Sequence, residues 1–382
     1  MIKVCYVIGT LEIGGAERQL LKLIKNIDRT KFSPVLIALR SGALKEEFEK
    51  AVKAIAIGKK HKVDIFFLIR LITALKRERP DILHTFMFTS NTWGRIAGIS
   101  AGVPVMIASE RCVDVYKRRH HRLIDRILLR RTFCVAANSS AVKEFYQRTE
   151  RIPESRITVI RNGVDMEEFK SAEPSFALKQ ELGIEKAEFI VGAGGRFTEQ
   201  KGFMNLLKAV PAVLEKCRDA FFIFVGDGPL MDDFRSYAKE KKIERNIIFT
   251  GYRKDILRIF AQCGVIAVPS LFEGMPNVVL EAMALKKPVL GTDIPEISEL
   301  VKDGDNGFLV PVKDNADAIA EKIILLYRNP GLCRSMGEKG HKEITERFSL
   351  AGMVRGYEKL YEEAIADSGR LRLPRPERRN SQ

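Results

Sequence analysis

The sequence has 382 residues, of which 46 % are hydrophobic and 30 % charged, and its formal net charge is +15. The length fits two domains of ordinary size, and the composition excludes wholesale disorder, collagen and coiled coil. The six cysteines include no C-x-x-C pair, so they favour free thiols in a reducing cytoplasm over zinc, disulfide or redox chemistry. Neither a run of about 18 apolar residues nor a secretory signal is visible, and we expect no membrane span.

In chain order, short apolar segments alternate with amphipathic ones, and this rhythm predicts strands separated by helices. In the first half the predicted strands are 3–9, 33–39, 80–86, 104–109, 133–139 and 157–163, with helices such as 16–27 and 65–76 between them. In the second half they are 188–194, 220–226, 246–251, 264–270 and 287–292. Nearly continuous apolar strands separated by helices are typical of buried parallel sheets. The sequence therefore predicts an α/β protein with two Rossmann-like, doubly wound domains.

Ser, Glu and Pro interrupt this rhythm near residues 169–177, which places a domain boundary there. We expect an N-terminal domain at 1–170 and a C-terminal domain at 171–345. A helix at 346–366 is predicted to cross back to the N-terminal domain, and the basic tail at 367–382 is predicted to be disordered. Since ligands bind at the carboxyl ends of parallel strands, the expected active site is a cleft across which the two domains face each other.

The positive charge is concentrated in the first half of the chain. Residues 1–170 contain 32 basic and 18 acidic residues, a surplus of 14, whereas residues 171–382 contain 32 basic and 31 acidic residues, a surplus of one. This asymmetry indicates an anionic partner of the first half, either nucleic acid or an acidic membrane face.

The segment AGGRFTEQKGFMNLLKA at 193–209 follows a predicted strand and opens an amphipathic helix. Its glycines allow close backbone approach, the helix N-terminus offers N–H groups, and Arg196 and Lys201 supply two cations, a combination that suits a diphosphate. It is neither a Walker loop nor the dinucleotide fingerprint, which would need glycine where Phe197 stands. A Gly-rich turn with two solvated charges is the simpler alternative.

Two further segments combine glycine turns with helix starts. In SLFEGMPNVVLEAMA at 270–284, Glu281 is placed to accept hydrogen bonds from a ribose diol, Glu273 to hold sugar hydroxyls, and the N–H groups of 274–277 to cap phosphate or sugar oxygens. Alternatively, Glu281 is an exposed helix residue and Glu273 a loop charge. In GTLEIGGAERQLLKL at 9–23, Gly14 and Gly15 either present N–H groups to the same ligand or only form the turn.

Together these segments resemble the glycosyltransferases of the GT-B fold, specifically family 4 of the retaining, nucleotide-sugar-dependent enzymes (group 1), over nearly the whole chain. The motifs that carry the resemblance are GGAER at 14–18, NGVD at 162–165, GRFTEQKG at 195–202, GDGP at 226–229, and the two glutamates separated by seven residues, Glu273 and Glu281. Their order and spacing make the match specific, although each motif alone is weak.

The resemblance implies a role for each of these positions. Arg196 and Lys201 are expected to hold the donor diphosphate and to replace a metal ion, Glu281 to bind the ribose, and Glu273 to contact the transferred sugar. The complete expected donor site is Gly14, Gly15, Arg196, Lys201, Arg253, Glu273, Gly274, Met275, Asn277 and Glu281. No metal or other cofactor is expected, because the one D-x-D triplet, Asp303 to Asp305, sits in a sequence typical of a turn.

The sequence signals for residues that bind the acceptor are less specific than those for the donor site. Many relatives carry a histidine after a strand of the N-terminal domain, where this sequence has Glu110 followed by Arg111. His84, which ends the run PDILH within the predicted strand 80–86, is the nearest histidine candidate, and a satisfied structural histidine is an equal alternative. We therefore take His84 and Glu110 as candidate catalytic residues beside Glu273, Arg196 and Lys201, with the departing phosphate itself as a third possible base.

The segment YKRRHHRLIDRILLRR at 116–131 contains seven Lys and Arg residues and one acid. On a helix, Leu123, Ile124, Ile127 and Leu128 would form an apolar stripe flanked by basic residues, as in proteins that lie on anionic membranes. The expected membrane or anionic-acceptor contacts are Lys117, Arg118, Arg119, Arg122, Arg126 and Arg130. A core-packed helix with a solvated basic face is the alternative; for 64–80 a core helix capped by Asp64 is favoured.

These features lead to one hypothesis and two alternatives. We expect a retaining glycosyltransferase that moves a sugar from a UDP- or GDP-activated donor to a lipid-linked saccharide, peripherally on the cytoplasmic face of the plasma membrane, in surface polysaccharide synthesis. A sugar-nucleotide epimerase would share the fold but need neither an acceptor nor a membrane patch. A nucleic-acid-binding protein would explain the charge, but the sequence has no recognition motif or basic-aromatic stretch, and no nucleic acid is expected.

Overall fold

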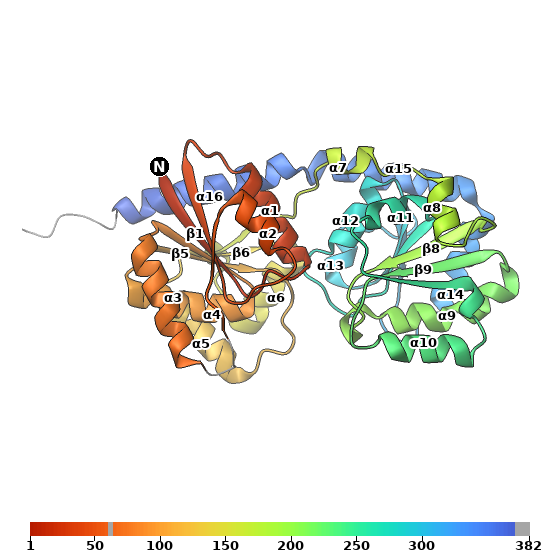
Figure 1. The fold of residues 1–382 in the computed structure, drawn as a ribbon, viewed down its shortest axis with the longest axis horizontal. Coiled ribbons are helices and arrows are strands. Elements are labelled where there is room, and N and C mark those ends of the chain that lie inside the picture. The colour runs from red at the N-terminus through yellow and green to blue at the C-terminus, as the bar shows by residue number, and fades with distance from the viewer. Residues whose placement is uncertain (60–63, 371–382) are drawn as a thin grey trace, which may run out of the picture. The chain divides into compact units, whose positions relative to one another are not determined.

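The computed structural model describes residues 1–59 and 64–370, which fall into two units (Figure 1). The first unit holds residues 1–138, 142–161 and the C-terminal segment from Ala351, and the second holds 139–141 and 162–350. The chain thus enters the second unit nine residues earlier than the sequence predicts. The reason is that Val164 bonds to the far end of that unit: its N–H donates to Phe348 O (2.8 Å) and its carbonyl accepts from Leu350 N (2.9 Å).

The first unit is built on a seven-stranded parallel sheet in the order β3-β2-β1-β4-β5-β6-β7. Its strands are β1 (Ile2–Ile8), β2 (Phe32–Ala38), β3 (Lys53–Ala56), β4 (Ile82–Phe86), β5 (Val105–Glu110), β6 (Cys134–Ala137) and β7 (Ile157–Val159). Six of them match predicted strands. The prediction missed β3, a four-residue edge strand without a continuous apolar run.

Helices cover both faces of this sheet (Figure 1). They are α1 (Gly15–Asn26), α2 (Lys45–Ala51), α3 (Ile65–Glu78), α4 (Phe88–Ala101), α5 (Arg119–Leu129), α6 (Ser140–Glu150) and α16 (Leu350–Arg370). On one face, Phe67, Leu71 and Leu75 of α3 pack against alternate strand residues such as Cys5 and Val7. Asp64 caps α3 as predicted, because its carboxylate accepts from Phe67 N (2.9 Å).

The opposite face is closed by α16, the helix expected to return to the first domain. Tyr357 and Tyr361 of α16 are buried against Tyr6 of β1 and His84 of β4. The helix continues through Arg370, so the expected disordered tail is wrong for residues 367–370. Residues 371–382 of that predicted tail lie outside the described residues.

The second unit has a six-stranded parallel sheet in the order β10-β9-β8-β11-β12-β13. Its strands are β8 (Phe189–Gly194), β9 (Ala220–Val225), β10 (Ile247–Gly251), β11 (Val265–Val268), β12 (Val289–Thr292) and β13 (Gly307–Val310). Its helices are α7 (Glu167–Lys170), α8 (Phe176–Glu181), α9 (Phe203–Lys216), α10 (Met231–Glu240), α11 (Ile256–Gln262), α12 (Asn277–Ala284), α13 (Pro295–Ser298), α14 (Ala316–Arg328) and α15 (Pro330–Arg347). Both sheets are therefore doubly wound and Rossmann-like, as predicted.

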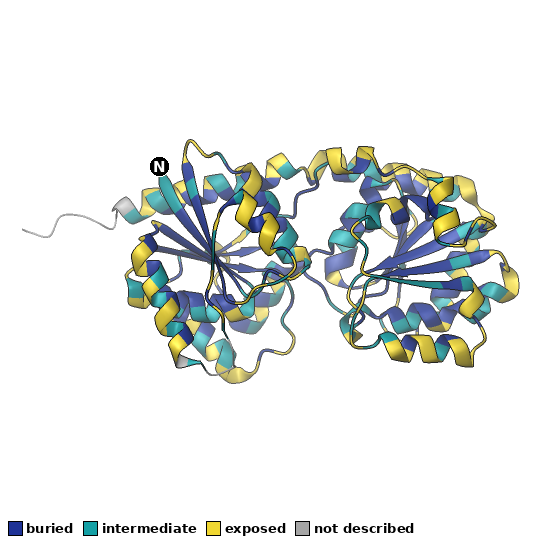
Figure 2. Cartoon of the chain, viewed as in Figure 1, coloured by how far each residue is buried: buried dark blue, intermediate teal, exposed yellow. Residues whose placement is uncertain are grey.

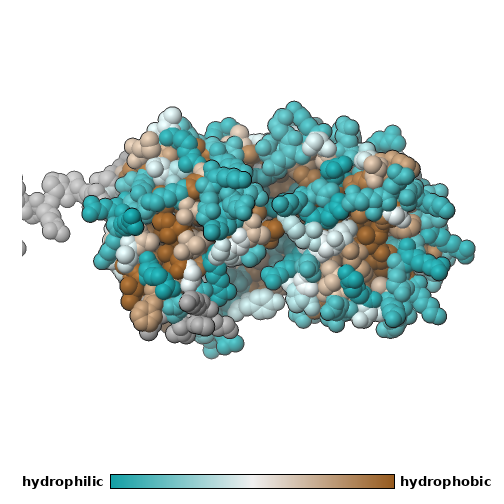
Figure 3. All heavy atoms as spheres, in the orientation of Figure 1, coloured by the Kyte–Doolittle hydropathy of each residue, from teal (hydrophilic) through white to brown (hydrophobic). Residues whose placement is uncertain are grey.

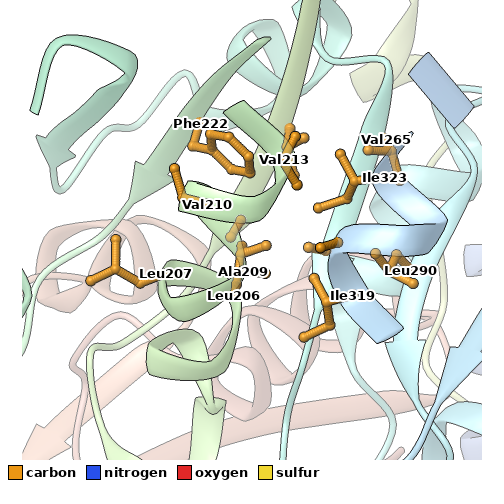
Figure 4. Close-up of a cluster of buried hydrophobic side chains, with 14 of the residues drawn as sticks. Leu206, Leu207, Ala209, Val210, Val213, Phe222, Val265, Leu290, Ile319 and Ile323 are labelled. Atoms are coloured by element: carbon orange, nitrogen blue, oxygen red, sulfur yellow. The ribbon is translucent and has the colours of Figure 1, made fainter. Parts of the chain in front are cut away.

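Strand alternation explains why both faces of the second sheet are covered. Phe222 and Phe224 of β9 point into the core under α9 and α14, whereas Ile223 between them points to the core under α11 and α12. Figure 4 shows α9 side chains, among them Leu206 and Val210, meeting β9 and α14 in the first of these cores. The strands are mostly buried and the outer helix faces exposed (Figure 2). Each sheet is thereby a rigid base for the loops at its carboxyl edge.

Close backbone packing fixes the loop that links β8 to α9. Gly202, the residue before α9, has a φ of +61°, and a Cβ on it would lie 1.9 Å from Pro269 O, just after β11. The loop can approach β11 this closely only because position 202 has no side chain.

We predict that Gly202→Ala destabilises the second unit by at least about 1 kcal/mol more than Gly183→Ala does. Gly183 has a similar φ of +68°, but a Cβ there meets nothing within 4 Å. The difference between the two variants therefore measures the cost of the clash with Pro269, because both variants share the cost of a side chain at positive φ. Urea denaturation monitored by circular dichroism measures both variants, and equal losses of stability would contradict the packing argument.

Candidate functional site

Three loops at the carboxyl edge of the second sheet are bonded into one cluster. Gly195 N donates to Val225 O (2.9 Å) and Phe197 N to Asp227 O (3.0 Å), which joins the loops after β8 and β9. Leu271 N donates to Gln200 O (2.8 Å), which joins the loop after β11 to that after β8. A Cβ on Gly226 would lie 2.0 Å from Gly195 O, so the GDGP motif is required for the close packing of these loops. The GRFTEQKG and GDGP motifs are thus parts of one structure.

At the centre of this cluster, two predicted site residues form an ion pair. Lys201 Nζ lies 2.6 Å from Glu273 Oε1, and the same oxygen accepts a hydrogen bond from Ser270 Oγ (2.7 Å). Glu273 is 6 % exposed. The alternative that Glu273 is merely a loop charge in solvent is therefore wrong. Because an ammonium group has three donors, Lys201 keeps two of them for other groups.

The other two predicted donor-site cations of this unit, Arg196 and Arg253, differ in whether a carboxylate pairs with them. Arg196 is exposed, and within residues 1–59 and 64–370 nothing pairs with its guanidinium. Arg253 is held by two carboxylates, with Nε and Nη2 each 2.8 Å from Asp255 and Nη1 2.6 Å from Glu181. These hydrogen bonds and charges raise the pKa of Arg253. Arg196 is thus available to an anion as it stands, while Arg253 is already neutralised.

The turn before α12 is held in shape by the NGVD motif. Asn162 Nδ2 donates to Met275 O (3.1 Å) and to Asn277 Oδ1 (2.7 Å). Ser139 Oγ, which belongs to the same unit, donates to Gly274 O (2.9 Å). Gly274, Met275 and Asn277 are therefore positioned by residues far away in the sequence, while Glu281 lies partly exposed on α12.

Sequence reasoning missed two polar residues that support the site. Thr292 at the end of β12 donates from Oγ1 to the carbonyl of Ser270, and Ser270 in turn donates to Glu273. Ser270 and Thr292 are both fully buried. No local sequence signal could have found them, since Thr292 simply ends the apolar strand β12 and Ser270 follows the apolar strand β11.

The D-x-D triplet forms the predicted turn before β13. Asp303 Oδ1 accepts from Leu309 N (2.9 Å), and Asp305 pairs with Lys339 at 2.8 Å. Across the described residues, no group of three or more His, Cys, Asp or Glu side chains is arranged to hold a metal ion. The two carboxylates of the triplet are therefore committed to local structure.

In the first unit, Gly14 and Gly15 lie at the start of α1, as expected from the GGAER motif. The Glu17 carboxylate folds back over this turn, since a Cβ on Gly14 would lie 2.2 Å from Glu17 Oε2. Burial raises the pKa of Glu17, and the charge of Arg111 opposes that rise. The start of α1 thus carries its own carboxylate, and the donor role of Gly14 and Gly15 stays a prediction.

The structure contradicts the catalytic role suggested for His84. The residue lies in the middle of β4 instead of ending it, and it is fully buried. Nδ1 lies 2.7 Å from Tyr361 Oη and Nε2 2.8 Å from Ser109 Oγ, so both ring nitrogens are satisfied. Burial, together with the charge of Arg111, holds its pKa well below the usual range. His84 is a structural histidine, and its hydrogen bond with Tyr361 helps to hold α16 on the sheet.

Glu110, the other acceptor-side candidate, belongs to a buried charged cluster around Lys117. Lys117 Nζ lies 3.1 Å from Glu110, 3.0 Å from Asp125 and 2.9 Å from Glu150. Burial opposes the charged form of Lys117, but the three carboxylates together raise its pKa. Burial, opposed by Lys117, raises the pKa of Glu150 to about 7. The prediction that Lys117 contacts a membrane is therefore wrong, because the residue is 6 % exposed and anchors the start of α5.

The remaining basic residues of this segment do lie outside. Arg118, Arg119, Arg126 and Arg130 are exposed, and Arg122 is partly exposed. The predicted apolar stripe is divided, since Leu128 packs inward while Leu123 and Ile127 are 57 % and 55 % exposed. Hydrophobic atoms also appear among hydrophilic ones on the surface of this unit (Figure 3). We call Tyr116, Leu123, Ile127 and these five arginines the α5 basic face.

Comparisons with known proteins agree with this fold. The family model described as glycosyl transferases group 1 matches residues 175–343, and the one described as Glycosyltransferase Family 4 matches residues 13–168. An Escherichia coli protein, the UDP-Gal:alpha-D-GlcNAc-diphosphoundecaprenol alpha-1,3-galactosyltransferase, is 28 % identical over 386 residues, covering 96 % of this chain and 98 % of that one. The structure of Anabaena HepE with UDP-glucose has a TM-score of 0.83 at 21 % identity, covering 95 % of this chain and 100 % of that one.

The chain belongs to the group 1 glycosyltransferases and has their GT-B fold of two doubly wound sheets. It is a glycosyltransferase, as the sequence predicted. Across the described residues, none of the helices combines the length and hydrophobicity that a bilayer crossing requires.

The buried cluster around Lys117 yields a stability prediction. Lys117→Met removes the cation that three buried carboxylates share, and we expect a loss of about 3–5 kcal/mol in the unfolding free energy of the first unit. Lys143→Met is the control, because Lys143 pairs with an exposed glutamate, Glu154, and should change stability little. Urea denaturation measures both, and a Lys117→Met variant as stable as the control would refute the anchoring role.

Proposed function

We propose that this protein transfers a sugar, with retention of configuration, from a UDP-activated donor to a lipid-linked saccharide at the cytoplasmic face of a membrane. The observation that carries the donor half is the loop cluster of the second unit. It contains the Lys201–Glu273 pair and, in the same loop as Lys201, the exposed Arg196, whose guanidinium has no partner among the described residues. Surface polysaccharide synthesis is the setting in which such an activity would act.

The two cations fit the chemistry of the leaving group. When a sugar leaves its nucleotide, negative charge grows on the diphosphate, and fixed cations stabilise that charge more than they stabilise the ground state. Arg196 offers a planar set of donors that matches phosphate oxygens, and Lys201 offers the two donors that Glu273 does not use. In this proposal these side chains supply the positive charge that a D-x-D metal site supplies elsewhere, and no metal is required.

Glu273 and Glu281 complete the donor site. Glu281 on α12 would accept hydrogen bonds from the ribose hydroxyls, and Glu273 would contact the transferred sugar. Because Ser270 and Lys201 already orient Glu273, its carboxylate is held in one position before any ligand arrives. Such preorganisation would hold the sugar in one orientation throughout the reaction.

The choice of UDP over GDP rests on similar proteins. The Escherichia coli relative is named for a UDP-galactose donor, and the HepE structures contain UDP or UDP-glucose. A GDP-sugar is the alternative that a binding panel would reveal.

The lipid-linked acceptor is supported by the α5 basic face and by the same relative. Exposed Leu123 and Ile127, four residues apart on α5, stand among arginines, which suits an amphipathic helix lying on anionic lipid. The Escherichia coli relative is named for a diphosphoundecaprenol-linked acceptor. With His84 buried, we propose that the departing phosphate helps to deprotonate the acceptor.

Arg196→Ala should weaken UDP binding by roughly 10- to 100-fold, because it removes a charge-assisted contact to phosphate. Arg245→Ala is the matched control, since Arg245 is an exposed arginine of the same unit outside the three loops. Isothermal titration calorimetry with UDP measures both. Equal affinities in the two variants would contradict the diphosphate assignment.

The α5 basic face gives a second prediction. Replacing Arg119, Arg126 and Arg130 by glutamine should reduce binding to vesicles of anionic phospholipid by about a hundredfold, because each basic residue near such a surface adds to the attraction. Glutamine at Lys25, Lys45 and Lys50, exposed lysines of α1 and α2, is the control of equal charge. Co-sedimentation with the vesicles is the readout. If both triple variants lose the same affinity, net charge and not the α5 basic face is responsible.

A further inference from the structure

Glu296 stands beside the donor-site cluster without having been assigned any role. It lies in the first turn of α13, four residues after β12 ends, and β12 pairs with β11, whose loop carries Glu273. The bond from Thr292 to the Ser270 carbonyl ties the ends of these two strands together. In a doubly wound sheet, loops at the carboxyl ends of neighbouring strands surround the ligand.

The Glu296 side chain is buried but lacks a partner. The residue is 5 % exposed, and no hydrogen bond or ion pair joins its carboxyl group to another residue of the described chain.

Two neighbouring carboxylates, those of Glu299 and Glu273, do hydrogen-bond other residues. Glu299, one turn further on, accepts from Ser140 N (2.8 Å) and Ser140 Oγ (3.2 Å). Glu273 is satisfied by Lys201 and Ser270. Burial, and then the charges of Glu273 and Glu299, raise the pKa of Glu296 to about 7. A hydrogen bond from its own backbone N–H opposes this rise. Of these three acidic side chains, Glu296 is the one that hydrogen-bonds no other residue of the described chain.

Buried polar groups in folded proteins are nearly always hydrogen-bonded to other groups, so a buried carboxyl group that no other residue bonds calls for an explanation. A partner missing from the chain itself can be supplied by a ligand. We infer that Glu296 hydrogen-bonds a hydroxyl or amide group of the transferred sugar and thereby determines which sugar the enzyme accepts. This inference rests on the proposed function, because it places the donor sugar next to Glu273.

The chemistry suits sugar discrimination. A carboxyl group near half-protonation at neutral pH both donates and accepts hydrogen bonds, as does a sugar hydroxyl. A site built to hydrogen-bond one hydroxyl rejects an analogue that lacks it or orients it differently, because the buried group is then left unpaired. UDP contains no transferred sugar, so its binding would not depend on Glu296.

The test compares Glu296→Ala and Glu296→Gln with the wild type in calorimetric titrations of UDP, UDP-galactose, UDP-glucose and UDP-N-acetylglucosamine. Glu296→Ala should bind UDP normally, lose roughly tenfold or more in affinity for the preferred UDP-sugar, and discriminate less among the three. Glu296→Gln, which keeps both hydrogen-bonding functions, should recover part of the loss. Glu215→Ala on the exposed side of α9 is the control and should behave as wild type.

A thermal melt of the same variants separates recognition from folding. Removing an unpartnered buried carboxyl should leave the melting temperature unchanged or raise it. Wild-type affinities and preferences in folded Glu296→Ala, or an equal loss for UDP and UDP-sugars, would overturn the inference while leaving the proposed function intact. A wild-type protein that binds none of the UDP-sugars would overturn the proposed function and this inference with it.

Discussion

The ion pair between Lys201 and Glu273 is the contact on which the donor site depends. It joins the loop after β8 to the loop after β11, the two strands between which the sheet order reverses direction. Two glycine contacts, Gly202 with Pro269 and Gly226 with Gly195, and several backbone bonds hold these loops so close that Glu273 is buried and Lys201 partly buried. Each partner thereby acquires a second function, since Glu273 is oriented and Lys201 is kept at the edge where a diphosphate would lie.

A comparable buried charge organises the first unit. Lys117 ties the start of α5 to Glu110 at the end of β5 and to Glu150 at the end of α6. With its base fixed, α5 turns Leu128 inward and leaves Leu123, Ile127 and its arginines exposed. The lysine in the middle of the basic segment is therefore structural, and the arginines around it form the surface. The α5 basic face, which we propose binds anionic membrane, and the buried lysine that attaches it therefore arise from one stretch of sequence.

The sequence was sufficient for most of the strands and for the motif loops, because a buried parallel strand and a Gly-rich turn both leave local patterns. It was insufficient wherever long-range contacts decide. His84 and Lys117 look like functional residues locally, but Tyr361 and Glu150, remote in sequence, bury and neutralise them. Conversely, Ser270 and Glu296 give no local signal. Ser270 lies in the same loop as Glu273, whereas only the pairing of β11 with β12 brings Glu296 near that loop. The short edge strand β3 was missed because its residues lack an apolar run.

The most direct measurement follows the label from a radioactive UDP-sugar in the presence of anionic vesicles and a saccharide carried on a polyprenyl diphosphate. We predict that the label moves into the organic phase with the acceptor, at a rate that depends on both substrates, and that it stays in the aqueous phase when the acceptor is omitted. Label that stays aqueous while the UDP-sugar is converted to its epimer without any acceptor would contradict glycosyl transfer as the function of this protein.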